Sequence, residues 1–184
     1  MKRLSFIAVF AMFTFAVEAQ EPKFAPVDAS PADIVYYPLN VAKAKDAATP
    51  SIKVVYSRPT KKGRDIFGVL EQYGKVWRVG ANECTEVKFF KGVRIGGKSI
   101  KPGSYSLFAI PNKDKWTLIV NKQTDRWGAF TYDEKKDVIR VDVPVKTLDK
   151  PVESFSVTFT EQPKGANLVM AWDKTLVELP IEIK

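Results

Sequence analysis

Alternating apolar and polar residues run through most of the chain after Ile52, and they predict short β-strands. The clearest run lies at 154–160, where Phe155, Val157 and Phe159 alternate with serine and threonine. A similar run at 176–183 alternates Val, Leu and Ile with Glu and Pro. Segments 116–120 and 168–172 are almost entirely apolar, as central strands are. About ten short strands predict an all-β antiparallel sandwich, jelly-roll-like or a partly open barrel.

Turn residues separate these runs. Gly96-Gly97 stands between 93–95 and 98–100 and predicts a type I′ hairpin. Asp173-Lys174 and the segment 162–165 separate the last three runs, and Pro180 favours an edge position for the final strand. The hairpin glycines also complete a formal match to a phosphate-binding loop, GVRIGGKS. That motif needs a following helix, which this context does not offer, so no nucleotide site is expected.

The first residues have the pattern of a signal peptide. Lys2 and Arg3 precede an apolar run at 4–17, and Val-Glu-Ala at 17–19 provides a cleavage site. The run is shorter than a membrane-spanning helix, so we expect no integral membrane segment after cleavage. We therefore expect residues 1–19 to direct export, to the periplasm or outside the cell. Residues 20–50 would form a lead-in with a first strand at 33–39 and a linker, and 51–184 a single sandwich domain.

Composition narrows the chemistry. The chain has no histidine and one cysteine, Cys84, which excludes Ser-His and Cys-His nucleophile pairs, His-ligated metals and an internal disulfide. We expect no cofactor and no metal site. Lys and Arg number 29 against 21 Asp and Glu, and removing residues 1–19 leaves a net charge of +7. The basic residues are scattered without interleaved aromatics, so we expect no nucleic-acid partner.

The segment from Ser57 to Glu83 breaks the alternation over 27 residues. Connections of this length are usually functional or disordered, and its aromatic and aliphatic residues predict that it packs down. Residues 65–72 could form one or two helical turns. The segment holds six basic and three acidic residues, and it could line a polar pocket. It could instead be a structural plug, in which Arg78 pairs with Glu83 and Asn82 caps a turn.

Three strings in the chain resemble a secreted bacterial family, domain of unknown function 2911. They read SRPTKKGRDIFG, YGKVWRVGANE and KPGSYSLFAIPNKDKWTLIVNK, and the resemblance extends from about Ile52 to the C-terminus. The resemblance implies export, a β-rich fold and a shared polar constellation without an assigned activity. Cys84 departs from the small or polar residue usual at its position, which argues against a role for its thiol. The linker at 43–50 also looks longer than the family's.

These observations favour a non-catalytic binding module for a small anionic or glycan-like ligand. Basic side chains would bind its charge, Asn82 and Glu83 would orient it, and two tryptophans would form apolar walls. The expected site residues are Arg58, Lys62, Arg64, Trp77, Arg78, Asn82, Glu83 and Trp127. One alternative is a carboxylate-based hydrolase or lyase with Glu83 as base and Arg78 as stabiliser, for which Glu86 or Asp65 are weak candidates as second carboxylate. Another is a structural envelope protein. The oligomeric state stays open.

Overall fold

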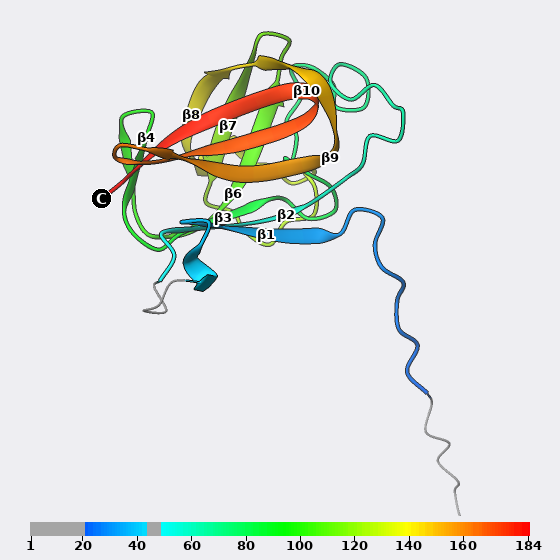
Figure 1. Ribbon diagram of the computed structural model, residues 1–184, viewed down its shortest axis with the longest axis horizontal. Coiled ribbons are helices and arrows are strands. Elements are labelled where there is room, and N and C mark those ends of the chain that lie inside the picture. Colours follow the sequence, from blue (N-terminus) through cyan, green and yellow to red (C-terminus); the bar gives the residue numbers. More distant parts are fainter. Residues whose placement is uncertain (1–20, 44–48) are drawn as a thin grey trace, which may run out of the picture.

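The computed structural model describes residues 21–43 and 49–184 and arranges them as two β-sheets packed face to face (Figure 1). The expected signal peptide at 1–19 lies outside the described residues. Two short 3-10 turns, η1 (Val41–Lys43) and η2 (Glu134–Lys136), interrupt the strands. The strands within the described ranges are β1 (Ala32–Tyr37), β2 (Ile52–Ser57), β3 (Glu86–Phe89), β4 (Val93–Ile95), β5 (Lys98–Ile100), β6 (Gly103–Pro111), β7 (Lys115–Asn121), β8 (Asp137–Pro144), β9 (Lys146–Gln162) and β10 (Gly165–Ile183).

Both sheets are antiparallel and open. The six-stranded sheet has the order β1-β2-β3-β6-β7-β8, and the four-stranded sheet has the order β5-β4-β10-β9. The all-β antiparallel sandwich expected from the alternation is therefore confirmed, and the two sheets do not close into a barrel. The lead-in contributes β1, which pairs with β2 from Ala32↔Ser57 to Tyr37↔Ile52 and forms one edge of the larger sheet.

The turns fall where the sequence places them. Gly96 and Gly97 have φ of 53° and 79° between the paired residues Ile95 and Lys98, which confirms the type I′ hairpin. Asp173 has φ of 53°, and β10 doubles back there, so that the Ile183 N–H donates to the Lys164 carbonyl at 2.8 Å. Figure 1 shows this return as the pair of orange-red and red strands.

The prediction that Pro180 places its strand at an edge is wrong. β10 lies inside the smaller sheet, between β4 and β9. Its pairing with β4 covers only Glu182 and Ile183. Proline, which has no N–H to donate, is tolerated at position 180 because that ladder does not reach it.

An aromatic cluster fills one end of the core. Trp116 and Trp172 are buried, as expected for central strands, and Phe155 joins them from β9. The long connection between β2 and β3 adds Phe67, whose ring centroid lies 4.8 Å from that of Trp116, and Trp77, which stacks at 6.1 Å on Trp172. This confirms that the segment packs down. It does so through turns and single bridges, and the helical turns considered for 65–72 do not form.

A second, smaller cluster lies on the outer face of the six-stranded sheet. Cys84, Phe108 and Ile119 are buried there, with Val76, Ile110, Ala129 and Tyr132 packed against them. Residues 122–136, between β7 and β8, supply Ala129 and Tyr132 and so cover this part of the sheet. The Tyr132 hydroxyl donates to Asp137 at 2.6 Å, and the Asn121 amide donates to the Asp133 carbonyl at 3.0 Å. These bonds hold the connection in place beside the site described next.

Candidate functional site

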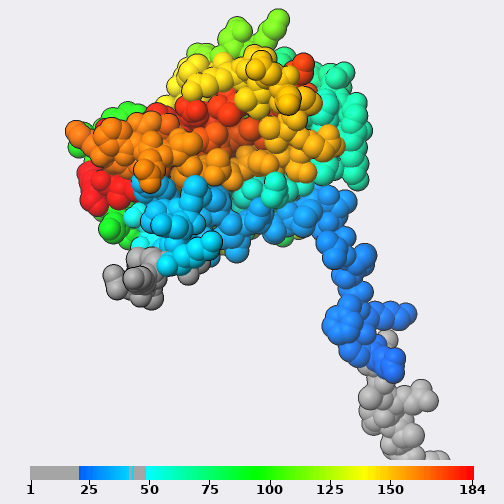
Figure 2. Space-filling view, viewed as in Figure 1, coloured from blue at the N-terminus to red at the C-terminus, as the bar shows by residue number. Residues whose placement is uncertain are grey.

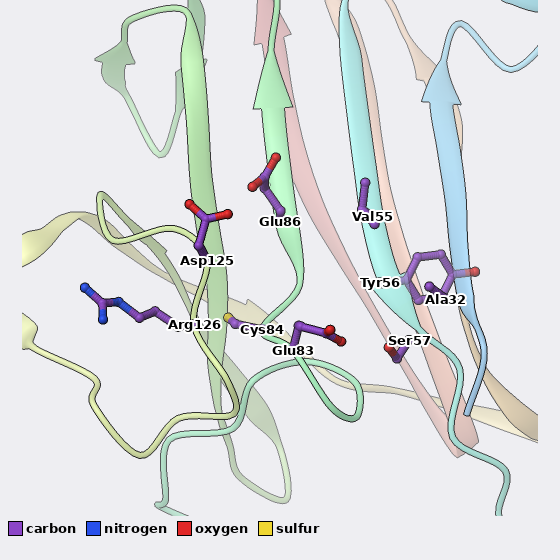
Figure 3. A pocket seen from close by; sticks show the side chains of 9 residues that line it. All are labelled: Ala32, Val55, Tyr56, Ser57, Glu83, Cys84, Glu86, Asp125 and Arg126. Carbon is purple, nitrogen blue, oxygen red and sulfur yellow. The ribbon is translucent and has the colours of Figure 1, made fainter. Parts of the chain in front are cut away.

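A pocket of about 350 Å³ opens on the outer face of the larger sheet (Figure 3). Strands β1, β2 and β3 form its floor, and the ends of two connections form its wall. The residues that line it are Ala32, Val55, Tyr56, Ser57, Glu83, Cys84, Glu86, Asp125 and Arg126. Pockets of this volume lie within the range that holds small organic ligands.

The strand pattern accounts for the floor. Side chains alternate between the two faces of a sheet, so Val54 and Val87 enter the core while their neighbours face outward. Pairing then places Ala32 opposite Ser57 and Val55 opposite Glu86 on the outer face. The floor is therefore apolar at β1 and in the middle of β2, and polar at Ser57 and Glu86.

Two segments far apart in sequence meet to form the wall. The Cys84 N–H donates to the Arg126 carbonyl at 2.8 Å, and the Gly128 N–H donates to the Asn82 carbonyl at 3.0 Å. Between these bonds, Glu83 and Trp127 form a single antiparallel bridge. This ladder places Glu83 and Asp125 at the same pocket.

The charges in the pocket are mainly acidic. Three carboxylates, those of Glu83, Glu86 and Asp125, accompany one guanidinium, that of Arg126. Within the described ranges none of the three carboxylates is in an ion pair, and Asp125 accepts only a hydrogen bond from the neighbouring Thr124 hydroxyl at 2.8 Å. Figure 3 shows Arg126 extending away from the carboxylates.

Some carboxylates elsewhere in the described chain are paired with a basic side chain. Seven acidic side chains in the described chain have a basic partner within 4.0 Å: Asp33, Glu134, Asp137, Asp142, Asp173, Glu178 and Glu182. The protein carries more Lys and Arg than Asp and Glu, so partners are abundant. The pocket carboxylates form no ion pair among the described residues, and the same is true of several other acids, but these three share one pocket.

Two small polar side chains complete the pocket. Ser57 is 5% exposed and lines the pocket, and its hydroxyl makes no hydrogen bond to another described residue. Cys84 is also buried, and this burial raises the pKa of its thiol to about 12. The thiol is therefore neutral at physiological pH and packs as a small apolar group, the inert form of a structural cysteine.

The expected basic residues do not gather at this pocket. Arg58 donates to Asp33 at 2.9 Å and to the Ser156 hydroxyl at 3.0 Å, which ties β2 to β1 and β9. Lys62 and Arg64 line a separate hollow of about 340 Å³ with Ala29, Ser30 and Thr60. There the Arg64 guanidinium already donates to the carbonyls of Lys61 and Thr60, at 3.0 and 2.6 Å.

Trp77 is not a pocket wall. It is 3% exposed, and its ring packs in the aromatic core. The backbone explains this position: Trp77 and Ala109 exchange N–H···O bonds of 2.7 and 2.9 Å, so the segment extends the sheet beside β6 and turns the ring inward. The interpretation of Trp77 as a ligand contact is corrected accordingly.

Arg78 does not pair with Glu83, the partner that it would have if the long connection were a structural plug. No ion pair joins Arg78 to Glu83 in the described chain, and the guanidinium Nε is buried without a hydrogen-bond partner. Its acidic neighbour is Glu71. Burial raises the pKa of the Glu71 carboxyl to about 7, even though Arg78 and Arg64 act in the opposite direction. Arg78 does not line the acidic pocket.

The remaining candidates lie at the pocket wall. Glu83 lines the pocket. Asn82 has φ of 55°, and its amide donates to Asp28 at 3.0 Å, so it shapes the backbone beside Glu83. Trp127 is 62% exposed and bridges to Glu83 through the backbone, but its side chain is not part of the lining.

Sequence reasoning missed Ser57, Asp125 and Arg126 as site residues and treated Glu86 as a weak candidate. The alternation at 85–89 places Glu86 on the other face of its strand from the core-facing Val87, so an outward position could be inferred. No local pattern indicates that Asp125 reaches the same place, because that contact depends on the pairing of Cys84 with Arg126.

Neither a metal centre nor a membrane span is found in the described part of the chain. No group of three or more His, Cys, Asp or Glu side chains there has the arrangement to hold a metal ion. None of the helices there combines the length and apolar character needed to cross a bilayer.

Comparisons with known proteins identify a family without an assigned activity. Neither the curated proteins nor the solved structures contain a match to this chain. A family model described as "Protein of unknown function (DUF2911)" matches residues 38–181, which include most of the pocket. The chain therefore belongs to the DUF2911 family of proteins of unknown function.

Proposed function

We propose that the protein is an exported, non-catalytic binding module that holds a small organic molecule in the outer-face pocket. One observation carries the proposal: a pocket of about 350 Å³ is lined by carboxylates and a hydroxyl that have no strong partner within the described fold. Glu83 and Asp125 are exposed, Glu86 is half-buried and Ser57 is buried, so the pocket offers a ligand charged and hydrogen-bonding groups that it can reach from solvent. Export to the periplasm or cell surface is supported by the charge and apolar pattern of residues 1–19.

The basic residues expected to bind an anionic or glycan-like ligand lie away from the outer-face pocket. Lys62 and Arg64 line the separate hollow, where Arg64 is engaged by carbonyl oxygens. Arg58 is occupied by Asp33. The outer-face pocket is the better supported site because its polar groups are not committed to the fold.

Ligand screening by thermal shift tests the proposal. A ligand at about 100 times its Kd stabilises the native state by about 2.7 kcal/mol. Ala32→Phe places a ring at the pocket floor, on an exposed strand position, and should abolish the shift. Thr158→Phe, on the exposed face of β9, is the matched control and should keep it. Ligands that raise the melting temperature of Ala32→Phe as much as that of wild type would show that they do not bind in the pocket. A screen in which no ligand raises the melting temperature of wild type would favour a structural envelope protein.

A carboxylate-based hydrolase is the second candidate, because Glu83 shares the pocket with Glu86 and Asp125 (Figure 3). Glycosidases work with two such carboxylates facing a substrate. Arg78 does not line the pocket, so Arg126 would be the local cation. Incubating each hit with the protein and analysing it by mass spectrometry separates the candidates. A binding module returns the ligand unchanged, whereas a hydrolase gives a product that Glu83→Gln forms more slowly.

A further inference from the structure

We infer that the ligand of the outer-face pocket is a small organic cation, a primary ammonium group on an apolar body. The inference rests on the proposed function, because it names the chemical class of the molecule held at that site. It combines four properties of the pocket: its size, its charge, the hydroxyl of a nearly buried serine and an apolar floor.

The charge balance sets the sign of the ligand. Glu83, Glu86 and Asp125 stand against the single guanidinium of Arg126, which points away from them. An anion at this place would be repelled by three carboxylates, whereas a cation would be attracted by all of them. The chain without residues 1–19 has a net charge of +7, so the excess of carboxylates lining this pocket is opposite in sign to the charge of the whole. Such a reversal directs cations to this part of the surface.

Ser57 indicates how the cation is held. The residue is only 5% exposed and lines the pocket, and its hydroxyl makes no hydrogen bond to another described residue. A hydroxyl oxygen and carboxylate oxygens accept hydrogen bonds, and a primary ammonium donates three. Figure 3 shows the Glu83 carboxylate extending toward the side of Ser57. An ammonium between these two groups would be bound by charge and by hydrogen bonds together.

The rest of the floor fits an apolar body. Ala32 and Val55 present methyl groups, and Cys84 adds a neutral thiol. A bare metal ion would leave this apolar part of the pocket unused. The carboxylates also lack the arrangement that metal binding needs among the described residues. An organic cation uses both parts of the pocket.

Three probes with one aromatic body and different charges test the inference: phenethylammonium, phenethyl alcohol and hydrocinnamate. Their affinities for the full exported chain are measured by isothermal titration calorimetry. We expect the ammonium to bind at least about tenfold more tightly than the alcohol, and the carboxylate to bind most weakly. The preference should shrink in about 0.5 M NaCl, because salt screens exposed and half-buried charges.

A charge-neutral variant and a matched control test the assigned residues. Glu83→Gln, Glu86→Gln and Asp125→Asn together should remove the preference for the ammonium and leave the affinity for the alcohol unchanged. The control changes three exposed acids elsewhere, Asp114→Asn, Asp149→Asn and Glu161→Gln. It alters the net charge equally and should retain the preference. Ser57→Ala should lower the affinity for phenethylammonium by about threefold to tenfold, the loss expected when one hydrogen bond is removed.

The outcomes separate this inference from the proposed function. Tightest binding of hydrocinnamate, equal binding of the three probes, an ammonium preference that survives the triple variant, or no ammonium binding at about 10 mM would each overturn the inference. If any probe or screening hit binds wild type and is lost in Ala32→Phe, the proposed function stands whatever the sign of its charge. If binding persists in Ala32→Phe, the proposed site itself fails.

Discussion

Glu71 makes the stability of the protein depend on pH in an unusual direction. The residue is half-buried in the long connection, where burial raises the pKa of its carboxyl from 4.5 to about 7. The nearby guanidinium groups of Arg78 and Arg64 oppose this effect without cancelling it. The native state therefore binds a proton more tightly than the unfolded chain does.

The sign and size of the effect follow from linkage. A carboxyl with a raised native pKa stabilises the native state fully below its unfolded pKa, and this stabilisation is lost as the pH rises through the native pKa. Between a pKa of 4.5 and one of about 7, the loss reaches up to about 3 kcal/mol. Glu71→Gln replaces the carboxyl by a group that stays neutral, so the variant avoids the loss.

Urea unfolding followed by tryptophan fluorescence measures the effect. At about pH 8 the unfolding free energy of Glu71→Gln should exceed that of wild type by up to about 3 kcal/mol, and at about pH 4 the two should agree. Glu161→Gln makes the same change on the exposed part of β9 and should match wild type at both pH values. A variant that is less stable than wild type at pH 8 would show that the attraction of Glu71 to the Arg78 and Arg64 guanidinium groups outweighs its burial, and would contradict this prediction.

Three further predictions concern the core, a turn and the thiol. Phe155→Ala removes a fully buried ring that contacts Tyr56, Trp77 and Trp172, and should lower the unfolding free energy by about 3–5 kcal/mol in urea titrations. Gly165→Ala would press a Cβ against the Ile181 carbonyl and should lower the melting temperature of the protein more than Gly63→Ala, whose added Cβ meets nothing. Equal losses of melting temperature in the two variants would contradict this steric explanation. Cys84 should resist a thiol reagent in the native state at about pH 8 and react on unfolding, because burial raises its pKa to about 12; rapid native labelling would show otherwise.

Local patterns predicted most of the fold. The alternation at 154–160 and the Gly96-Gly97 turn correspond directly to β9 and the β4–β5 hairpin, because side-chain periodicity and positive φ are properties of short segments. Pro180 misled the prediction, since a missing N–H matters only where a neighbouring strand requires it. Whether the β4 ladder reaches that residue is decided by the register between distant strands.

The site was predicted only in part for the same reason. Glu83 was identified from its place at the end of the irregular segment, and it does line the pocket. Trp77 was assigned to a wall because its neighbours are glycine-rich, but its pairing with Ala109 directs the ring into the core. Asp125 joins Glu83 through hydrogen bonds between segments about forty residues apart, which no short pattern encodes.

The most direct test of the binding proposal is a crystal structure soaked with phenethylammonium and hydrocinnamate. We expect electron density for phenethylammonium in the outer-face pocket, with its nitrogen at hydrogen-bond distance from the Ser57 hydroxyl and from at least one of the carboxylates of Glu83, Glu86 and Asp125. Hydrocinnamate bound instead against Lys62 and Arg64, with the outer-face pocket holding only solvent, would contradict it.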